Sequence, residues 1–192
     1  MKLLFGSFLT LLVAAAIGLG TTWLALTRGT AFGAVQIGAW TAWPRTGSSD
    51  IDPYARAGIA RTGELPVGLG DGVAFVARRD DIGRPFDGRC EMALRGTTPP
   101  ARFWTLTLYD PEGRLVANSA NRYGFTSQEI VRASDGTFEI IAAPRARPGN
   151  WLPTGGAERY VLVLRLYDTP VGVATGASRE VPMPTIVVRA CA

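Results

Sequence analysis

The sequence predicts an all-β fold, an antiparallel β-sandwich with one short helix, preceded by a single transmembrane helix. Residues 3–27 form an uncharged, mostly apolar run near the amino terminus. Beyond it, short segments alternate apolar and polar side chains between turns rich in Gly and Pro, of which the chain has 23 and 13, as expected for half-buried strands. We therefore expect a transmembrane anchor over residues 1–28, a linker over 29–49 and a β-sandwich domain over 50–192.

The apolar run is long enough to cross a membrane. As a helix, residues 3–27 would extend about 37 Å at about 1.5 Å per residue, against roughly 30 Å of bilayer hydrocarbon. The alternative is a cleaved signal peptide, whose apolar core has only about 7 to 15 residues before a cleavage site of small residues. Small residues occur at positions 14–16, but the apolar run continues well beyond them. We favour an anchor, with the lipid bilayer as the partner of residues 3–27.

Few charges bear on orientation. The α-amino group and Lys2 precede the apolar run and Arg28 follows it, which by the positive-inside rule favours a cytoplasmic amino terminus. The two cysteines, Cys90 and Cys191, can pair in an oxidising compartment. Such a bridge would close a loop of about 100 residues and stabilise the fold by about 4 to 5 kcal/mol. The alternative is two unpaired thiols.

The linker and the start of the domain carry local signals. Trp40 and Trp43 either lie at the bilayer surface as an aromatic belt or dock onto the domain, and the sequence leaves both open. Asp52 is a favourable N-cap, Pro53 suits a first helical position and Gly63 is a stop signal, so one short helix is predicted here.

The most strongly specified strand lies in RFWTLTLYDPEGRLV, residues 102–116. Trp104, Leu106 and Leu108 alternate with polar or smaller residues, which places the large apolar groups on one face. The residues that follow, Asp-Pro-Glu-Gly at 110–113, suit a reverse turn because Pro presets φ and Gly accepts a positive φ. A β-hairpin is therefore predicted.

A second central strand is predicted in YVLVLRLYD, residues 160–168. Apolar groups occupy both of its faces, so we expect it to be covered on both sides. Arg165 then requires a carboxylate partner, for which Glu91, Asp110 and Asp168 are candidates.

Further strands are predicted at 72–78, at 84–95 and, as an edge strand, at 185–189. Ser-Asp-Gly at 134–136 indicates a hairpin. The alternative is a helix from Ser127, opened by a capping box of Thr126 and Glu129.

The chain has no histidine, which excludes Ser-His-Asp and Cys-His catalysis and His-based metal sites. GxSxG, HExxH and Walker sequences are also missing, and we predict no metal site and no cofactor. The net charge is +4 with the basic residues scattered, so no nucleic-acid surface is expected. Glu91 and Asp110 remain as candidate catalytic carboxylates, with a core ion pair as the alternative role.

Ligand-binding candidates come from aromatic and polar groups in loops and bends. Trp151 follows Asn150 in a rigid Pro- and Gly-rich bend and either plugs the end of the sandwich or lines a ligand site. Tyr123 lies in a polar loop. Arg165 would supply an anion site.

The motifs FWTLTLYDPEGRLVANSANRYGF, the Asp-Gly hairpin, RPGNWLPTGG and YVLVLRLYD occur in that order. Over residues 72–168 the chain resembles the bacterial domain-of-unknown-function family numbered 1214. The resemblance implies a jelly-roll-like β-sandwich. Longer members carry a second unknown domain, numbered 1254, ahead of this one, where the present chain has its apolar run. The family has no established reaction, so the resemblance informs the fold more than the function.

Together these observations predict a single-pass protein of the bacterial inner membrane with a periplasmic sandwich. The favoured function is a binding or accessory module of the cell envelope, with an envelope protein or glycan as ligand. One alternative is a small envelope hydrolase or lyase that uses a carboxylate pair. Another is a structural partner subunit, whose sign would be an exposed apolar patch on one sheet.

Overall fold

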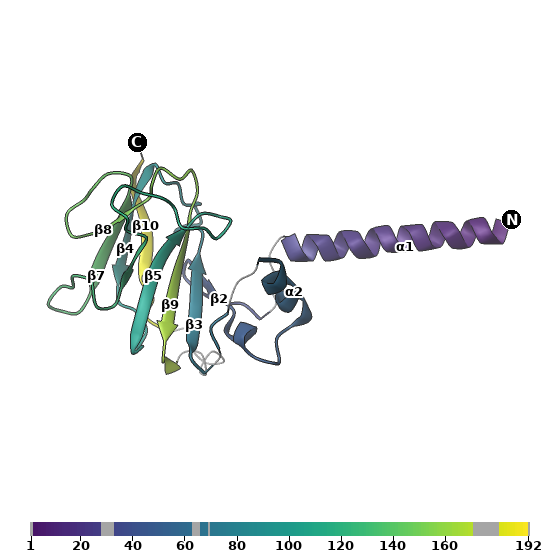
Figure 1. The fold of residues 1–192 in the computed structure, drawn as a ribbon, viewed down its shortest axis with the longest axis horizontal. Helices are drawn as coiled ribbons and strands as arrows, with labels where there is room; N and C mark the ends of the chain where they lie inside the picture. The colour runs from purple at the N-terminus through teal and green to yellow at the C-terminus, as the bar shows by residue number, and fades with distance from the viewer. Residues whose placement is uncertain (1, 28–32, 63–65, 69, 171–180, 192) are drawn as a thin grey trace.

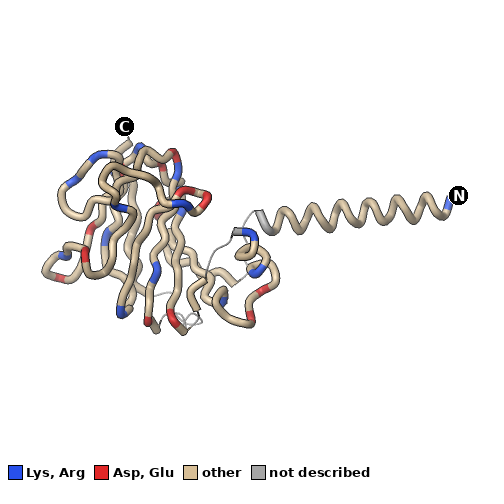
Figure 2. Tube along the Cα trace, in the orientation of Figure 1, with Lys and Arg blue, Asp and Glu red and all other residues tan. Residues whose placement is uncertain are grey.

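The computed structural model describes residues 2–27, 33–62, 66–68, 70–170 and 181–191. Helix α1 (Lys2–Thr27) extends away from a body made of two packed β-sheets (Figure 1). Residues 2–25 of this helix are long and apolar enough to span a membrane, and none of their most apolar window is buried in the protein. Lys2 is the only charged residue along α1 (Figure 2). The predicted apolar helix is therefore present, and it is compatible with a single-pass anchor.

The body contains a six-stranded sheet, with the order β1-β2-β3-β9-β5-β6, and a four-stranded sheet, with the order β10-β4-β7-β8. All neighbouring strands are antiparallel except β7 and β8, which are parallel. The strands of the six-stranded sheet are β1 (Val35–Ile37), β2 (Trp40–Ala42), β3 (Gly72–Ala77), β9 (Val161–Tyr167), β5 (Phe103–Tyr109) and β6 (Gly124–Thr126). Those of the four-stranded sheet are β10 (Thr185–Cys191), β4 (Cys90–Gly96), β7 (Phe138–Ala143) and β8 (Asn150–Pro153). The predicted all-β class is confirmed, and the jelly-roll topology stays a prediction.

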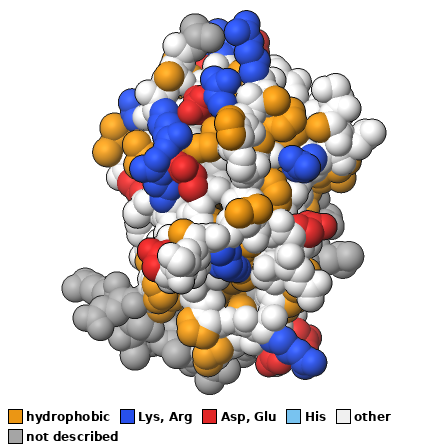
Figure 3. Space-filling model, turned by 90° about the vertical axis from the view of Figure 1, so that its left-hand side faces the viewer, with side chains coloured by type: hydrophobic (Ala, Val, Ile, Leu, Met, Phe, Trp, Pro, Cys, Tyr) orange, Lys and Arg blue, Asp and Glu red, His pale blue; other side chains and the backbone are white. Residues whose placement is uncertain are grey.

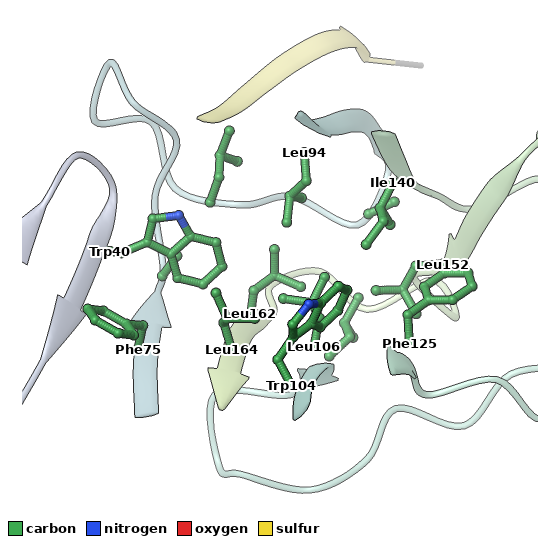
Figure 4. Packing of buried hydrophobic residues seen from close by; sticks show 14 of the residues in the cluster. Trp40, Phe75, Leu94, Trp104, Leu106, Phe125, Ile140, Leu152, Leu162 and Leu164 are labelled. Carbon is green, nitrogen blue, oxygen red and sulfur yellow. The ribbon is translucent and has the colours of Figure 1, made fainter. Parts of the chain in front are cut away.

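The hydrophobic core fills the space between the two sheets (Figure 4). Strand β5 shows why: its residues alternate between buried and half-buried, as the period of two predicts. Leu106 and Leu164 come from the six-stranded sheet, and Leu94 and Ile140 come from the other sheet to meet them. Strand β9 is buried on both faces along its first four residues, so the predicted double coverage holds for that part.

Two three-residue strands replace part of the predicted linker. The sequence predicts a linker over residues 29–49, but β1 and β2 pair with each other and β2 pairs with β3. Trp40 is only 1% exposed and belongs to the core, and its indole Nε1 donates a hydrogen bond to the carbonyl of Pro184 at 2.8 Å. Trp40 therefore docks onto the domain. Alternation in strands this short is too brief to be recognised in a sequence.

Asp81 fastens the β1–β2 turn to β10. Its Oδ1 accepts a hydrogen bond from the backbone N–H of Ala39 at 3.1 Å, and its Oδ2 accepts one from Ile186 N–H at 2.7 Å. The backbone N–H of Asp81 in turn donates to Ile186 O at 3.0 Å. These contacts pair the outer backbone groups of Ile186 on an edge strand, a position that otherwise invites association.

Short helix α2 (Pro53–Thr62) forms as predicted, after a 3-10 turn η1 (Pro44–Gly47). Asp52 Oδ1 accepts hydrogen bonds from the backbone N–H groups of Tyr54 at 2.9 Å and Ala55 at 3.2 Å. This is the expected N-cap geometry. The stop signal Gly63 lies outside the described residues.

Two turns share one construction, an Asp whose carboxylate binds the Arg four residues later. Asp80 Oδ1 accepts from Arg84 N–H at 2.7 Å and Asp80 Oδ2 binds Arg84 Nε at 2.8 Å. Asp110 and Arg114 repeat both contacts at 2.8 Å. The predicted turn after β5 is thus correct, but the return is limited to one bridge, between Tyr109 and Leu115. Along the rest of its length strand β5 pairs with β6 and β9, so the predicted hairpin is confirmed only at this bridge.

The turn at 134–136 is also formed, since Gly136 N–H donates to Ala133 O at 3.0 Å. Strand β7 follows it, whereas the segment before it contributes a single bridge from Arg132 to Phe138. Glu129 Oε2 accepts from Thr126 N–H at 3.2 Å, as in a capping box, but turn residues follow in place of a helix.

Candidate binding face on the four-stranded sheet

The outer face of the four-stranded sheet follows from strand alternation. On β4, Met92 and Leu94 point into the core, so Glu91, Ala93 and Arg95 point outward. On β7, the outward residues are Glu139, Ile141 and Ala143. Antiparallel pairing of Arg95 with Glu139 places these two charges opposite each other.

Three arginines and two glutamates form a continuous row on this face, which we call the arginine–glutamate ladder. Arg147 Nε binds Glu91 Oε2 at 2.5 Å, and Arg189 Nη1 lies 3.6 Å from Glu91 Oε1. Arg189 also binds Glu139, which binds Arg95 Nε at 2.5 Å. Each carboxylate is therefore shared by two guanidinium groups. Figure 3 views the molecule from the side of β7 and β8, where basic, acidic and apolar side chains lie next to one another.

The guanidinium groups of the ladder remain partly open to solvent. The side chains of Arg95 and Arg147 are 58% and 42% exposed, whereas that of Glu91 is only 17% exposed. A guanidinium has five N–H donors, and the carboxylates of the ladder use only some of them. The ladder therefore carries one excess positive charge and presents free N–H groups outward.

Disulfide bonding holds the ladder strands together. Cys90 and Cys191 form a disulfide that joins β4 to β10 across a sequence separation of 101 residues, which confirms the predicted pair. Cys90 is adjacent to Glu91 and Cys191 lies two residues after Arg189, so the covalent link fixes the end of the ladder.

Trp151 lies on the same outer face. Its ring packs against a small apolar cluster of Ala93, Ile141 and Ala143, and its Nε1 donates to Ala143 O at 3.0 Å. Of its two predicted positions, the end of the sandwich does not apply, because the ring packs on the outer surface of the sheet. Its half-buried position leaves part of the ring accessible.

A groove with a volume of about 770 Å³ lies at the Arg95 end of the ladder. Its polar lining includes Arg95, Arg132, Glu139 and Asn150, and its apolar lining includes Phe138 and Met183. The volume is typical of sites for small ligands.

Arg132 lies over the rings of Trp104 and Phe138, with its guanidinium carbon 5.7 and 5.5 Å from their centroids. It also donates to the carbonyl of Gly136 at 3.3 Å. Within the described residues no carboxylate forms an ion pair with it. Arg132 therefore raises the excess positive charge at the groove.

Asn150 borders the groove, but its amide serves the fold. Its Oδ1 accepts from Val131 N–H, and its Nδ2 donates to the carbonyls of Val131 and Glu139, each at 2.8 Å. The amide ties the loop before β7 to the sheet.

The other predicted site residues lie elsewhere. Arg165 is on the outer face of the six-stranded sheet, where Nη1 binds the hydroxyl of Tyr109 at 3.2 Å and the guanidinium lies over the Tyr109 ring. The predicted carboxylate partner was wrong, since an aromatic ring and a hydroxyl take its place. Tyr123 is half-buried in the loop before β6, and its carbonyl accepts from Leu108 N–H at 2.9 Å.

The two candidate carboxylates are not brought together. Glu91 lies on the four-stranded sheet with Arg147 and Arg189, while Asp110 lies in the turn after β5 with Arg114. The backbone N–H and guanidinium of Arg114 lower the pKa of the Asp110 carboxyl, which favours its ionised form. A general acid requires the opposite shift. In the part of the chain described here, no three His, Cys, Asp or Glu side chains gather closely enough to hold a metal ion.

Sequence reasoning missed most of the ladder. The signal was present as outward charges at alternate positions, in Glu91 and Arg95 of one segment and in Glu139 and Arg189 of two others. What the sequence does not show is that β4 lies between β10 and β7, which is what places these charges side by side.

The fold and this face define a β-sandwich domain that follows an apolar amino-terminal helix and presents a charged sheet surface. The chain belongs to the family described as "Protein of unknown function (DUF1214)", whose model matches residues 71–171.

The solved structures that are similar to this chain include the following two. The VPA0106 protein from Vibrio parahaemolyticus has 22% sequence identity and a TM-score of 0.59, over 72% of this chain and 36% of that protein. This likeness shows the fold, and the chain spans about a third of the length of that relative. A putative uncharacterized protein from Burkholderia cenocepacia has 16% identity and a TM-score of 0.41, over 92% of this chain and 52% of that protein. No curated protein matches the chain.

Proposed function

We infer that this protein is an accessory module of the bacterial cell envelope, which α1 anchors in the inner membrane as a single span. The sandwich lies in the periplasm and binds an envelope partner through the outer face of the four-stranded sheet. The observation that carries the proposal is the arginine–glutamate ladder, because it is the largest group of linked charges among the described residues and it borders a groove.

The anchor is supported by the exposure of α1. In a soluble domain a helix of this apolarity would pack against a core, but here its most apolar window has no buried residue. The disulfide between Cys90 and Cys191 supports an oxidising compartment, since cytoplasmic thiols are kept reduced. The periplasm is such a compartment.

The hydrolase or lyase alternative has no support from the two candidate carboxylates. A carboxylate pair must flank one substrate bond, whereas Glu91 lies on the four-stranded sheet, Asp110 lies in the turn after β5, and each is bound to arginine. The structural-subunit alternative requires exposed apolar side chains on one sheet. On this side of the molecule the exposed apolar residues Val131 and Val187 are 68% and 51% exposed. Val131 lines the groove and Val187 faces outward opposite Ala93.

A photocrosslinking amino acid placed on each outer face tests the proposal in living cells. Val187 is the test position and Thr107, on the outer face of the six-stranded sheet, is the matched control. We expect crosslinked products from position 187 and few from 107. Products from 107 alone would overturn the assigned face.

Anchoring is tested on the same cells. We expect the full chain to resist carbonate extraction from membranes and the sandwich to be digested by protease only after the outer membrane is opened. A chain released by carbonate, or protected from protease in spheroplasts, would contradict the proposed anchor or its orientation.

A further inference from the structure

We propose that the groove beside Arg95 and Arg132 binds an acidic glycan, a sugar chain that carries carboxylates. This inference rests on the proposed function, because it names the class of ligand for the face assigned there.

Charge on this face is unbalanced. The ladder pairs three arginines with two glutamates, and Arg132 adds a guanidinium with no described ion pair. Asp135, whose carboxylate accepts from the N–H and hydroxyl of Thr137 in the groove lining, offsets one of these charges. One positive charge therefore remains in excess around the groove and the row next to it. An excess of this sign in a partly enclosed site attracts anions.

The donors suit planar oxyanions such as carboxylates. A guanidinium binds a planar carboxylate through two parallel hydrogen bonds, and in the ladder Arg95 uses Nε for Glu139. Arg132 uses Nη1 for the carbonyl of Gly136. Both arginines line the groove, and each guanidinium has further N–H donors. An oxyanion can therefore bind there without displacing Glu139.

The rest of the groove suits a sugar ring better than a bare ion. Its lining contains apolar groups from Val131, Phe138, Pro148 and Met183. Next to them are the hydroxyls of Thr137 and Thr185, which donate to Asp135 and to the Arg95 carbonyl and keep their oxygens as acceptors. A volume of about 770 Å³ is many times that of one carboxylate. Apolar ring faces with hydroxyl edges match such a surface, and the ligand carboxylate accounts for the arginines.

The experiment measures binding of trigalacturonate, maltotriose and inorganic phosphate to the full chain in detergent by calorimetry. We expect trigalacturonate to bind at least tenfold more tightly than maltotriose, with affinity that falls as salt rises. Equal binding of the acidic and neutral sugars would overturn the inference. Phosphate that binds as tightly as trigalacturonate would also overturn it, because the site would then recognise an ion and not a glycan.

Two variants locate the site. Arg132→Gln should weaken trigalacturonate at least tenfold, while Arg114→Gln, an arginine of the Asp110 turn, should not. Because Arg132 also stacks on core aromatics, a second variant avoids loss of packing. Val131 is 68% exposed at the rim, so Val131→Glu should repel the ligand while Val131→Gln should not. Unchanged affinity in both Arg132→Gln and Val131→Glu would overturn the assigned groove.

The outcomes separate this inference from the proposed function. Failure of trigalacturonate with normal anchoring and face-specific crosslinks overturns the ligand class alone. Failure of anchoring or of crosslinks at Val187 overturns the proposed function, whatever the sugars do.

Discussion

The two sheets of this sandwich share one core but have different outer faces. Apart from the Arg165–Tyr109 stack and the Phe103–Tyr167 ring pair, the outer face of the six-stranded sheet presents short side chains such as Thr105, Thr107 and Val163 on β5 and β9. The four-stranded sheet presents the ladder, the Trp151 cluster and the groove. The shared core does not depend on which outer face carries the charges, so folding alone does not explain why they gather on the smaller sheet.

Exposed ion pairs contribute little to stability, about 0 to 1 kcal/mol each. A row of five partly exposed charges is therefore a weak means of holding a sheet together. Its concentration on one face supports a binding role, and the following predictions test the difference between the faces.

The largest expected effect concerns the disulfide, a covalent bond found in the four-stranded sheet. Reduction, or the double substitution Cys90→Ser with Cys191→Ser, should lower the free energy of unfolding by about 4 to 5 kcal/mol, because the unfolded chain regains the entropy of a long loop. Urea unfolding of the full chain in detergent, with and without reductant, measures this. Coincident unfolding curves would show that β10 is held by noncovalent contacts alone.

Truncation of an aromatic residue should cost more stability on the outer face of the four-stranded sheet than on that of the six-stranded sheet. Trp151→Ala should destabilise the fold by about 2 kcal/mol, less than a fully buried Trp, because it removes the cluster with Ile141 and the hydrogen bond to Ala143. Phe103→Ala, which removes a tilted ring contact with Tyr167 at 6.0 Å, should cost about 1 kcal/mol. The same urea assay ranks the two variants, and the reverse order would contradict the packing described for Trp151.

Salt should change the stability cost of a charge substitution on the four-stranded sheet but not on the six-stranded sheet. Glu139→Gln removes a carboxylate shared by Arg95 and Arg189 and should cost about 1 kcal/mol at low salt and less at high salt. Arg165→Met breaks a contact with Tyr109 that involves no ion pair, so its effect should not change with salt. Thermal melting of both variants at two salt concentrations measures this. If both respond alike to salt, the ladder is not an electrostatic unit.

The smallest effect concerns acid stability. Hydrogen bonds from the Arg89 side chain and backbone lower the pKa of Asp87 from 3.8 to about 2. Because this pKa is lowered in the folded state, its stabilisation is complete above the unfolded value, near pH 4, and is lost as pH falls toward about 2. With Asp87→Asn, the melting temperature should fall less between pH 4 and pH 2 than it does in the unsubstituted protein. Asp110 has a pKa lowered by Arg114, and Asp110→Asn should act in the same direction at the six-stranded sheet. An unchanged acid profile in both variants would contradict these shifts.

Local features were predictable from the sequence and long-range ones were not. The α2 cap at Asp52, the turn at Gly113 and the alternation through Trp104 each depend on a few neighbouring residues. For the disulfide the sequence left two alternatives, a bridge or two free thiols. If a bridge forms within the chain, two cysteines allow only one pairing, and this pairing is observed.

The errors came from contacts between distant residues. Strand β5 pairs with β9 on one edge and with β6 on the other, so the segment after its turn forms only the bridge between Tyr109 and Leu115. Trp40 is buried through contacts with a segment 144 residues away. For the candidate site, Glu91, Trp151 and Asn150 were identified, but their relation to Arg147 and Arg189 depends on sheet order, which side-chain periodicity does not encode.

The fastening of Trp40 and Asp81 to β10 has a mechanical consequence. A pulling force applied through α1 would enter the body through the β1–β2 hairpin, whose strands have three residues each. Paired only with β3, such a hairpin would peel away strand by strand. Trp40 and Asp81 transfer part of that tension to β10, and the disulfide passes it on to β4. If α1 acts as a tether, these contacts would spread the load over both sheets.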